Sequence, residues 1–260
     1  MFKDKSIAIT GASGGIGRAI AEMFVAQGAK VAISDLKSPE ATAAEIGAAA
    51  FECDVTDEAA MQAFIAGAEA AHGPIDVFVS NAGVGFGDPK HAADASNEVW
   101  ELNWRVNVMS SVYAARALLP AWKKRGSGRF VITASAAGLL NQIGSASYSA
   151  TKHAAVSFAE SIAIRHWDHG IRAHCICPQY VRTDMTKGFD MAENSQDGLL
   201  EPSDVANALL ASMQDDQFLV LSHPVVAEYF KNRAMNYQGY ITGLNKLKQK
   251  MGNKHLPAKE

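Results

Sequence analysis

A tyrosine and a lysine stand four positions apart in the segment SASYSATKHAA, residues 145–155. On a helix, residues four apart lie on the same face, so the Lys152 ammonium can come close to the Tyr148 phenol. A free phenol has a pKa of about 10 and is a poor base at neutral pH, whereas a neighbouring ammonium favours the phenolate. The pair could therefore carry a proton to or from an alcohol oxygen. Tyrosine and lysine are also ordinary on helix surfaces, so the interpretation depends on the rest of the chain.

A second stretch with chemical potential is TGASGGIG, residues 10–17, between an apolar run and a segment of helical periodicity. Glycines at 11, 15 and 17 allow a tight turn that approaches a pyrophosphate, and the N–H groups at a helix N-terminus favour its negative charge. The spacing departs from the plain GxGxxG pattern, because Ile20 stands where the third glycine would be. The segment predicts a dinucleotide-binding turn.

Asp35 ends the next apolar run, close to the offset of roughly 20 residues at which an acidic side chain accepts hydrogen bonds from the ribose hydroxyls. The same carboxylate would repel the 2′-phosphate of NADP. The sequence therefore favours NAD as the cofactor, a preference that Lys37 weakens slightly.

Two other kinds of site compete with this interpretation. Residues 11–15 also satisfy GxSxG, which would make Ser13 the nucleophile of a hydrolase. That pattern would lie on the first strand, with no earlier strand to supply the second oxyanion-hole donor, and it leaves Asp35 unexplained. A metal site could be drawn from His166, Asp168, His169 and His174. Gly170 ends that helix, however, and cationic side chains suit a helix C-terminus, so we predict no metal.

The composition excludes several classes of protein. The 260 residues carry 24 basic and 27 acidic side chains, with a net charge of -3, and no long run of one sign that would follow a nucleic acid. The N-terminal segment lacks a signal-peptide pattern, and no apolar run approaches the roughly 20 residues of a membrane span. Cys53, Cys175 and Cys177 cannot all pair, which indicates buried, reduced thiols. We expect a cytoplasmic protein without nucleic-acid or membrane partners.

Apolar runs near residues 6, 30, 75, 129, 171 and 218 predict strands, and stretches of helical periodicity at 16–27, 57–71, 98–123 and 147–166 predict helices between them. Alternation of strand and helix predicts a parallel sheet. The runs are apolar on both faces, as expected when helices cover both sides. The prediction is an α/β, doubly wound, Rossmann-like single domain. Residues 1–222 would form the dinucleotide-binding and catalytic part, and 223–260 a helical C-terminal extension of the same domain.

Taken together, TGxxxGxG at 10–17, SNAG at 80–83, Ser135 and YSATK at 148–152 resemble the short-chain dehydrogenase/reductase family over about residues 5–221. The resemblance implies that Tyr148 is the general acid/base and that Ser135 holds the substrate oxygen. Lys152 would bind the nicotinamide ribose and assist the tyrosine, and Asn107 would support a water-linked proton relay. The cofactor contacts that we assign are Gly11, Ser13, Gly15, Ile16, Gly17, Asp35, Asp54, Val55, Asn81, Ala82, Gly83, Tyr148, Lys152, Pro178, Val181 and Thr183.

The chain departs from the family pattern in three places. Gln179 stands where the family has glycine after proline, Ser80 stands where asparagine is common, and the usual aspartate-glycine ending is replaced by the tail HPVVAEYFKNRAMNYQGY. We predict that the tail packs near residues 183–200 and covers an apolar substrate pocket. We also predict a homodimer or homotetramer, with the helices near 98–123 and 147–166 in a dimer contact.

The predicted function is an oxidoreductase that transfers a hydride between NAD(H) and an apolar secondary alcohol or ketone. The alternatives are an NADPH-dependent ketoacyl or carbonyl reductase of the same family, and a non-catalytic dinucleotide-binding regulator, since a fold does not fix a function. The substrate itself cannot be deduced, because residues 139–145, residues 185–200 and the tail carry no transferable code.

Overall fold

Seven parallel strands form one sheet in the computed structural model, which describes residues 1–88, 90–187 and 195–251. The strands are β1 (Ser6–Thr10), β2 (Lys30–Asp35), β3 (Ala49–Glu52), β4 (Val77–Ser80), β5 (Gly128–Thr133), β6 (Ile171–Ile176) and β7 (Leu219–Val220). Their order across the sheet is β3-β2-β1-β4-β5-β6-β7. The chain therefore reverses its direction of winding between β1 and β4, where ligands bind in sheets of this kind.

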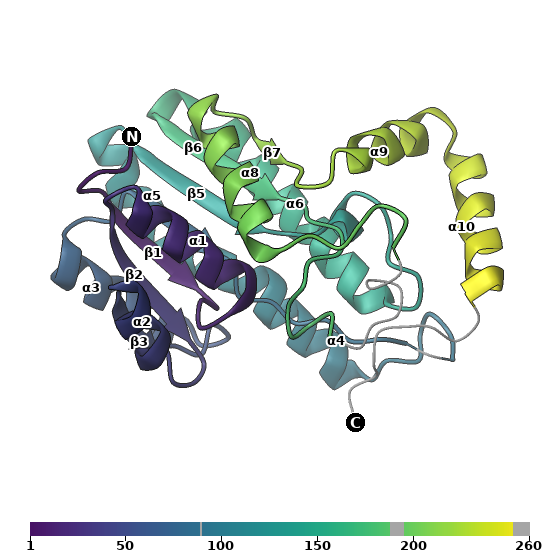
Figure 1. Cartoon of the computed structure of the whole chain (residues 1–260), viewed down its shortest axis with the longest axis horizontal. Coiled ribbons are helices and arrows are strands. Elements are labelled where there is room, and N and C mark those ends of the chain that lie inside the picture. Colours follow the sequence, from purple (N-terminus) through teal and green to yellow (C-terminus); the bar gives the residue numbers. More distant parts are fainter. Residues whose placement is uncertain (89, 188–194, 252–260) are drawn as a thin grey trace.

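Helices cover both faces of the sheet, as the strands apolar on both sides predict (Figure 1). One layer consists of α1 (Gly15–Ala26), α2 (Glu40–Ile46) and α8 (Pro202–Gln214), whose apolar side chains share a core with β1 and β2. The other consists of α3 (Glu58–His72), α4 (Asn97–Trp104), α5 (Ser110–Arg125) and α6 (Ala146–His166). The predicted doubly wound α/β fold is confirmed.

Three elements, α2, β3 and α8, lie outside the predicted strands and helices, and α2 and β3 follow one another in the chain. The segment EATAAEI is only two turns long, and AAFE is only partly buried on a sheet edge, so neither has a strong periodic pattern. They complete the connection from β2 to α3. Their presence makes β3, rather than β2, the edge strand next to the adenine side of the predicted site.

The helix predicted over 98–123 is interrupted. A π-helical turn, η1 (Arg105–Met109), separates α4 from α5. A π turn inserts one extra residue into the helical path, which rotates the side chains on either side of it relative to one another. Here the turn contains Asn107, whose buried side chain faces α6 and the segment after β4.

The C-terminal tail is helical, as predicted. It forms α9 (Val225–Met235) and α10 (Tyr237–Met251), which reach away from the sheet, while residues 252–260 of the predicted extension lie outside the described residues (Figure 1). Within the described parts of the chain, none of the helices has both the length and the apolar character needed to cross a membrane.

Candidate active site

A cavity of about 770 Å³ opens where the carboxyl ends of β1, β4, β5 and β6 meet. This volume lies within the range of sites for small ligands and cofactors. It is lined by most of the predicted site residues, namely Gly11, Ser13, Gly15, Ile16, Asp35, Asp54, Val55, Asn81, Ala82, Gly83, Ser135, Tyr148, Lys152, Pro178, Val181 and Thr183. Residues far apart in the chain therefore meet in one place.

The turn between β1 and α1 is held by close backbone approaches. Gly11 has a φ of 63°, and a Cβ atom on it would lie 2.7 Å from the Cα of Ala82. A Cβ on Gly17 would lie 2.3 Å from the carbonyl oxygen of Gly11. The first turn of α1 thus packs directly under the loop and aims its N–H groups at the cavity, a geometry that suits an anionic pyrophosphate.

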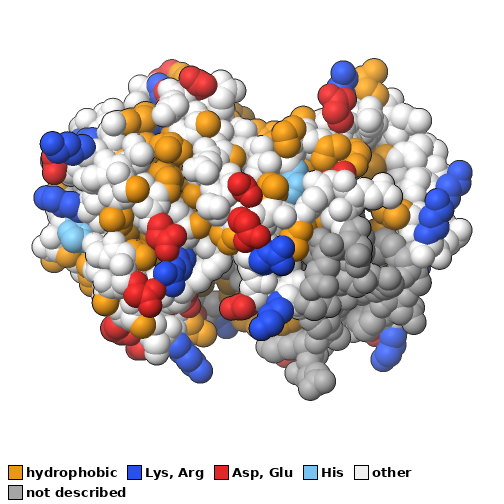
Figure 2. All heavy atoms as spheres, viewed as in Figure 1, with side chains coloured by type: hydrophobic (Ala, Val, Ile, Leu, Met, Phe, Trp, Pro, Cys, Tyr) orange, Lys and Arg blue, Asp and Glu red, His pale blue; other side chains and the backbone are white. Residues whose placement is uncertain are grey.

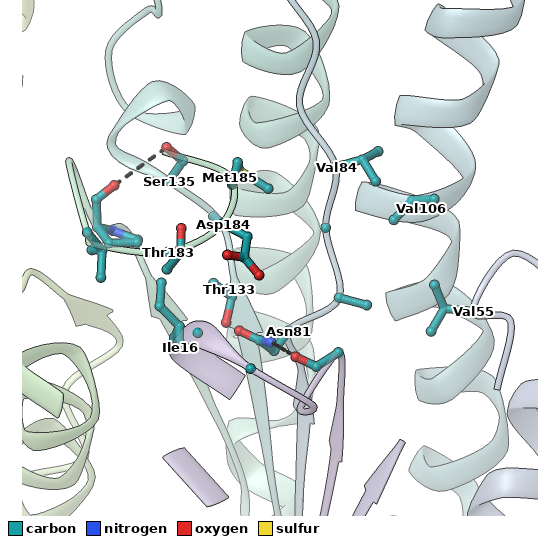
Figure 3. Close-up of a pocket in the computed structure, with 18 of the residues that line it drawn as sticks. Ile16, Val55, Asn81, Val84, Val106, Thr133, Ser135, Thr183, Asp184 and Met185 are labelled. Atoms are coloured by element: carbon teal, nitrogen blue, oxygen red, sulfur yellow. Dashed lines mark hydrogen bonds between the residues drawn. The ribbon is translucent and has the colours of Figure 1, made fainter. Parts of the chain in front are cut away.

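Asn81 joins the ends of β1 and β4 behind this turn. Its Nδ2 donates to the carbonyl oxygens of Thr10 and Gly11 at 3.1 and 2.9 Å, and its backbone N–H donates to Thr10 Oγ1 at 3.0 Å. The amide therefore acts as a bridge in the floor of the cavity, as Figure 3 shows.

Asp35 lies at the end of β2 with its carboxylate fixed by the backbone. Oδ2 accepts from the Ser13 N–H at 3.0 Å, and Oδ1 accepts from the Leu36 N–H at 2.8 Å. Asp54 and Val55 line the cavity nearby, and Asp54 Oδ1 accepts from the Thr56 N–H at 2.9 Å. A carboxylate held in this way keeps lone pairs that can accept further hydrogen bonds.

Ser13 does not have the surroundings of a nucleophile. Its Oγ is buried and, within the described residues, has no hydrogen-bond partner, so it has no histidine base within reach. A nucleophilic serine requires such a base. The absence of such a base beside Ser13, in the part of the chain that the structure describes, disfavours the hydrolase alternative.

At the other end of the cavity, Ser135 follows β5, and Tyr148 and Lys152 lie on α6. Ser135 Oγ accepts from the Ala137 N–H at 3.1 Å and donates to the Pro178 carbonyl oxygen at 3.5 Å (Figure 3). Lys152 Nζ is 5.5 Å from the centroid of the Tyr148 ring and donates to the Thr133 carbonyl oxygen at 3.0 Å. The three side chains share one wall of the cavity.

Burial decides the direction of both pKa shifts. It lowers the pKa of the Lys152 ammonium to about 8. It raises the pKa of the Tyr148 phenol, although a hydrogen bond with Ser135 acts in the opposite direction. The pKa of Tyr148 is therefore shifted upward, opposite to the shift expected from its lysine neighbour, because burial is the largest effect. Burial therefore favours the protonated form of Tyr148.

Two predicted site residues, Gly17 and Asn107, are not among the residues that line the cavity. Gly17 is packed under the turn, where its lack of a side chain matters more than any contact with a ligand. Asn107 is 4% exposed, and its Oδ1 accepts from the Val84 N–H at 2.9 Å while Nδ2 donates to the Val84 carbonyl oxygen at 2.9 Å and to Thr151 Oγ1 at 3.1 Å. It supports the wall from behind.

The segment after β6 forms the remaining wall, and beside the predicted Pro178, Val181 and Thr183 it contributes side chains that no motif predicted. Figure 3 shows Thr183, Asp184 and Met185 on one side of the cavity, opposite Val84 and Val106. Gln142, Gln179 and Tyr180 also line it. Gln142 and Met185 fall in the two segments where the sequence carries no transferable code, so only their position in the fold could identify them.

The four residues considered for a metal do not converge. The His166 and His169 rings are 5.6 Å apart, but His174 Nδ1 bonds to the Gln217 carbonyl oxygen at 2.8 Å and its Nε2 to Arg129 at 3.1 Å. In residues 1–88, 90–187 and 195–251, no group of three His, Cys, Asp or Glu side chains is arranged to hold a metal ion. The three cysteines are free and buried.

Comparison with known proteins defines the class of protein. The model of the family described as short chain dehydrogenase matches residues 5–194, so the chain belongs to this family. It is 34% identical over 213 residues to "Oxidoreductase UcpA" of Salmonella typhimurium, covering 79% of this chain and 80% of that protein. It is 31% identical over 238 residues to "Borneol dehydrogenase, mitochondrial" of Lavandula x intermedia, covering 87% and 90%.

The fold is also similar to that of solved structures. A short chain dehydrogenase/reductase from Burkholderia phymatum, solved in complex with NAD, superposes with a TM-score of 0.80 at 26% identity, covering 91% of this chain and 95% of that one. The chain is therefore an oxidoreductase of this family with a site for a nicotinamide dinucleotide. The residues present fit such a cofactor, because the glycine turn, the buried Ser13 hydroxyl and the Asp35 carboxylate form one continuous wall.

Proposed function

We propose that this protein transfers a hydride between NAD(H) and a secondary alcohol or its ketone. The observation that carries the proposal is the cavity itself, which has Asp35 and the glycine turn at one end and Ser135, Tyr148 and Lys152 at the other. In this assignment, residues 1–222 bind the dinucleotide and carry the catalytic groups, and 223–260 extend the same domain.

The nicotinamide, when bound, accepts or supplies the hydride. During ketone reduction, the Tyr148 O–H donates its proton to the carbonyl oxygen, which suits a phenol whose pKa is raised by burial. The Ser135 hydroxyl donates to the same oxygen and stabilises the negative charge that develops there. Lys152, beside the Tyr148 ring, holds the ribose. Asn107 fixes the wall beside Lys152 and Thr151, where a water-linked relay would run.

NAD is preferred over NADP in this proposal because Asp35 places a carboxylate at the end of β2, where the ribose would bind. Its carboxylate would accept two hydroxyl donors and would repel a phosphate. The similar proteins are consistent with the proposal, since one of them was solved in complex with NAD and another is a borneol dehydrogenase. NADPH-dependent ketoacyl reduction is the alternative that Asp35 disfavours.

The substrate is a small molecule with a largely apolar body. The lining includes the apolar side chains of Val84, Leu102 and Met185, and Gln142 and Tyr180 add polar groups to it. Action in the cytoplasm and assembly as a homodimer or homotetramer remain predictions.

The test is a screen of secondary alcohols with NAD, followed by the absorbance of NADH, with Tyr148→Phe beside the unmodified protein. We expect Tyr148→Phe to lose turnover by a factor of about 100 or more and to bind NADH nearly as before, because the hydroxyl acts on the substrate. Lys152→Met should lower both the turnover and the affinity for NADH. Near-normal turnover of Tyr148→Phe across the pH range would show that this phenol is not the proton donor.

A further inference from the structure

Gln179 occupies an unusual position in the cavity wall. It follows Pro178 at the carboxyl end of β6, and its side chain lines the cavity beside Tyr180. Its backbone N–H donates to His223 Nδ1 at 3.4 Å, at the start of the tail. The backbone of Gln179 is therefore connected to a residue of the tail that lies outside the cavity.

The Gln179 side chain is the first member of a hydrogen-bonded path to the tail. Its Nε2 donates to Asp197 Oδ2 at 2.9 Å, and Asp197 Oδ1 accepts from the Tyr229 hydroxyl at 3.0 Å. Tyr229 lies on α9. Among the described residues, Asp197 forms no salt bridge with a lysine or arginine, so these two donors hold its carboxylate in place.

The segment around Asp197 is paired with the cavity wall through its backbone. The Leu200 N–H donates to the Tyr180 carbonyl oxygen at 3.1 Å, and the Arg182 N–H donates to the Leu200 carbonyl oxygen at 2.8 Å. A displacement of Asp197 would therefore be passed directly to residues 180–182, which include Tyr180 and Val181 of the lining.

The far end of α9 is attached to the opposite wall. Arg233 Nη1 donates to the Leu139 carbonyl oxygen, to that of Leu140 at 3.1 Å, and contacts His153 Nε2 at 3.0 Å. These carbonyl groups belong to the loop that follows Ser135. Figure 2 shows hydrophobic side chains gathered where α9 meets the body of the molecule. Within the described residues, no tail side chain lines the cavity, so α9 supports both walls from outside.

We propose that Gln179 is a positioning residue that couples α9, through Asp197 and Tyr229, to the substrate end of the cavity, so that the tail sets which alcohols fit. The inference rests on the proposed function. It replaces the predicted direct cover by a support that acts through hydrogen bonds. Glycine at position 179 would have no side chain to make this connection.

The experiment compares Tyr229→Phe, Gln179→Met and the double variant with the unmodified protein. Tyr240→Phe is the matched control, because the Tyr240 hydroxyl has no hydrogen-bond partner among the described residues. Kinetics are measured with 2-propanol and 2-octanol. We expect Tyr229→Phe to raise the KM for 2-octanol relative to that for 2-propanol about three- to tenfold, the equivalent of one hydrogen bond. Its kcat and NADH affinity should stay unchanged.

The double variant should change the ratio of the KM for 2-octanol to that for 2-propanol by the same factor as each single variant, within about twofold. The reason is that each of the three variants breaks the same hydrogen-bonded path. Hydrogen–deuterium exchange supplies a readout that needs no substrate. Tyr229→Phe should speed exchange at residues 178–182 and 195–200, whereas Tyr240→Phe should not. Exchange that changes only within α9, or an unaltered KM ratio, would overturn the inference. If no alcohol is oxidised, the proposed function is wrong. The hydrogen–deuterium exchange result then tests by itself whether α9 is coupled to residues 178–182.

Discussion

Tyr148 and Lys152 show that the properties of a catalytic residue depend on more than its neighbour in the helix. The two side chains are one turn apart, yet burial raises the pKa of the phenol and lowers that of the ammonium. Asp35 is different, because the backbone N–H groups of Ser13 and Leu36 hold its carboxylate at the end of β2. At this scale, orientation and burial decide what each group can do.

The prediction at the residue scale concerns Asp35. Asp35→Ala should weaken NAD binding about tenfold or more, because hydrogen bonds to a charged acceptor are worth about 1.5–3 kcal/mol. Titration of the protein with NADH, followed by fluorescence, measures this effect. Glu52→Ala is the control, since Glu52 is the partner of Asp35 on β3 but is not among the lining residues. Equal or better kinetics with NADP in the unmodified protein would contradict the proposed preference.

The turn between β1 and α1 shows how one element positions a binding site. Gly17 must approach the carbonyl oxygen of Gly11 and the Asn81 amide, at 2.3 and 2.5 Å from where a Cβ would lie. A Cβ added to Gly14, three residues earlier, would meet no other atom within 4 Å. The two glycines therefore differ in the same turn, in agreement with the pattern TGxxxGxG, which requires glycine at 17 and leaves position 14 open.

At the element scale, Gly17→Ala should destabilise the fold by about 1–3 kcal/mol and abolish measurable NADH binding, because the loop must move away from α1. Gly14→Ala is the matched control and should change stability by less than about 1 kcal/mol. Thermal unfolding and NADH titration of both variants provide the measurement. Equal effects of the two substitutions would show that close packing under the turn is not what the site requires.

For the whole molecule, the charged cluster near the amino ends of β5 and β6 links stability to pH. Arg129 and Arg172 share the Asp216 carboxylate at 2.7 and 3.3 Å, and Arg129 also contacts His174. Burial lowers the pKa of His174 from 6.5 to about 4, and the two arginines act in the same direction. On the face shown in Figure 2, acidic and basic side chains are otherwise interspersed.

The sign of this effect follows from linkage. Below pH 6.5 the unfolded chain binds a proton at residue 174 before the folded protein does, so stability falls as the pH falls from 6.5 to about 4. The loss attributable to His174 is about 3 kcal/mol at most. Chemical unfolding at several pH values should therefore show that the free energy of unfolding of His174→Gln falls less steeply below pH 6.5 than that of the unmodified protein. The exposed-site variant His91→Gln should follow the unmodified protein, and a flattening of equal size in that control would refute the assignment.

The sequence by itself determined the elements whose signals are local. Apolar runs and helical periodicity predicted most strands and helices, and the glycine turn, Asp35, and the Ser135, Tyr148 and Lys152 pattern predicted the two ends of one cavity. These features can be inferred because each depends on neighbours within a few residues or on a motif of fixed spacing. The edge strand β3, the helix α2 and the π turn were missed, since each is short and lacks a periodic pattern. The helix α8 was not predicted either.

Only the tertiary structure decided which side chains meet. In the folded chain, Asn107 lies behind the cavity wall, and burial raises the pKa of Tyr148. Gln179, Asp197 and Tyr229 come together from three separate segments. Contacts between distant segments and the degree of burial depend on how whole layers pack, and no local pattern encodes either of them. The same reason explains why the path from the tail to the cavity became visible only in the folded chain.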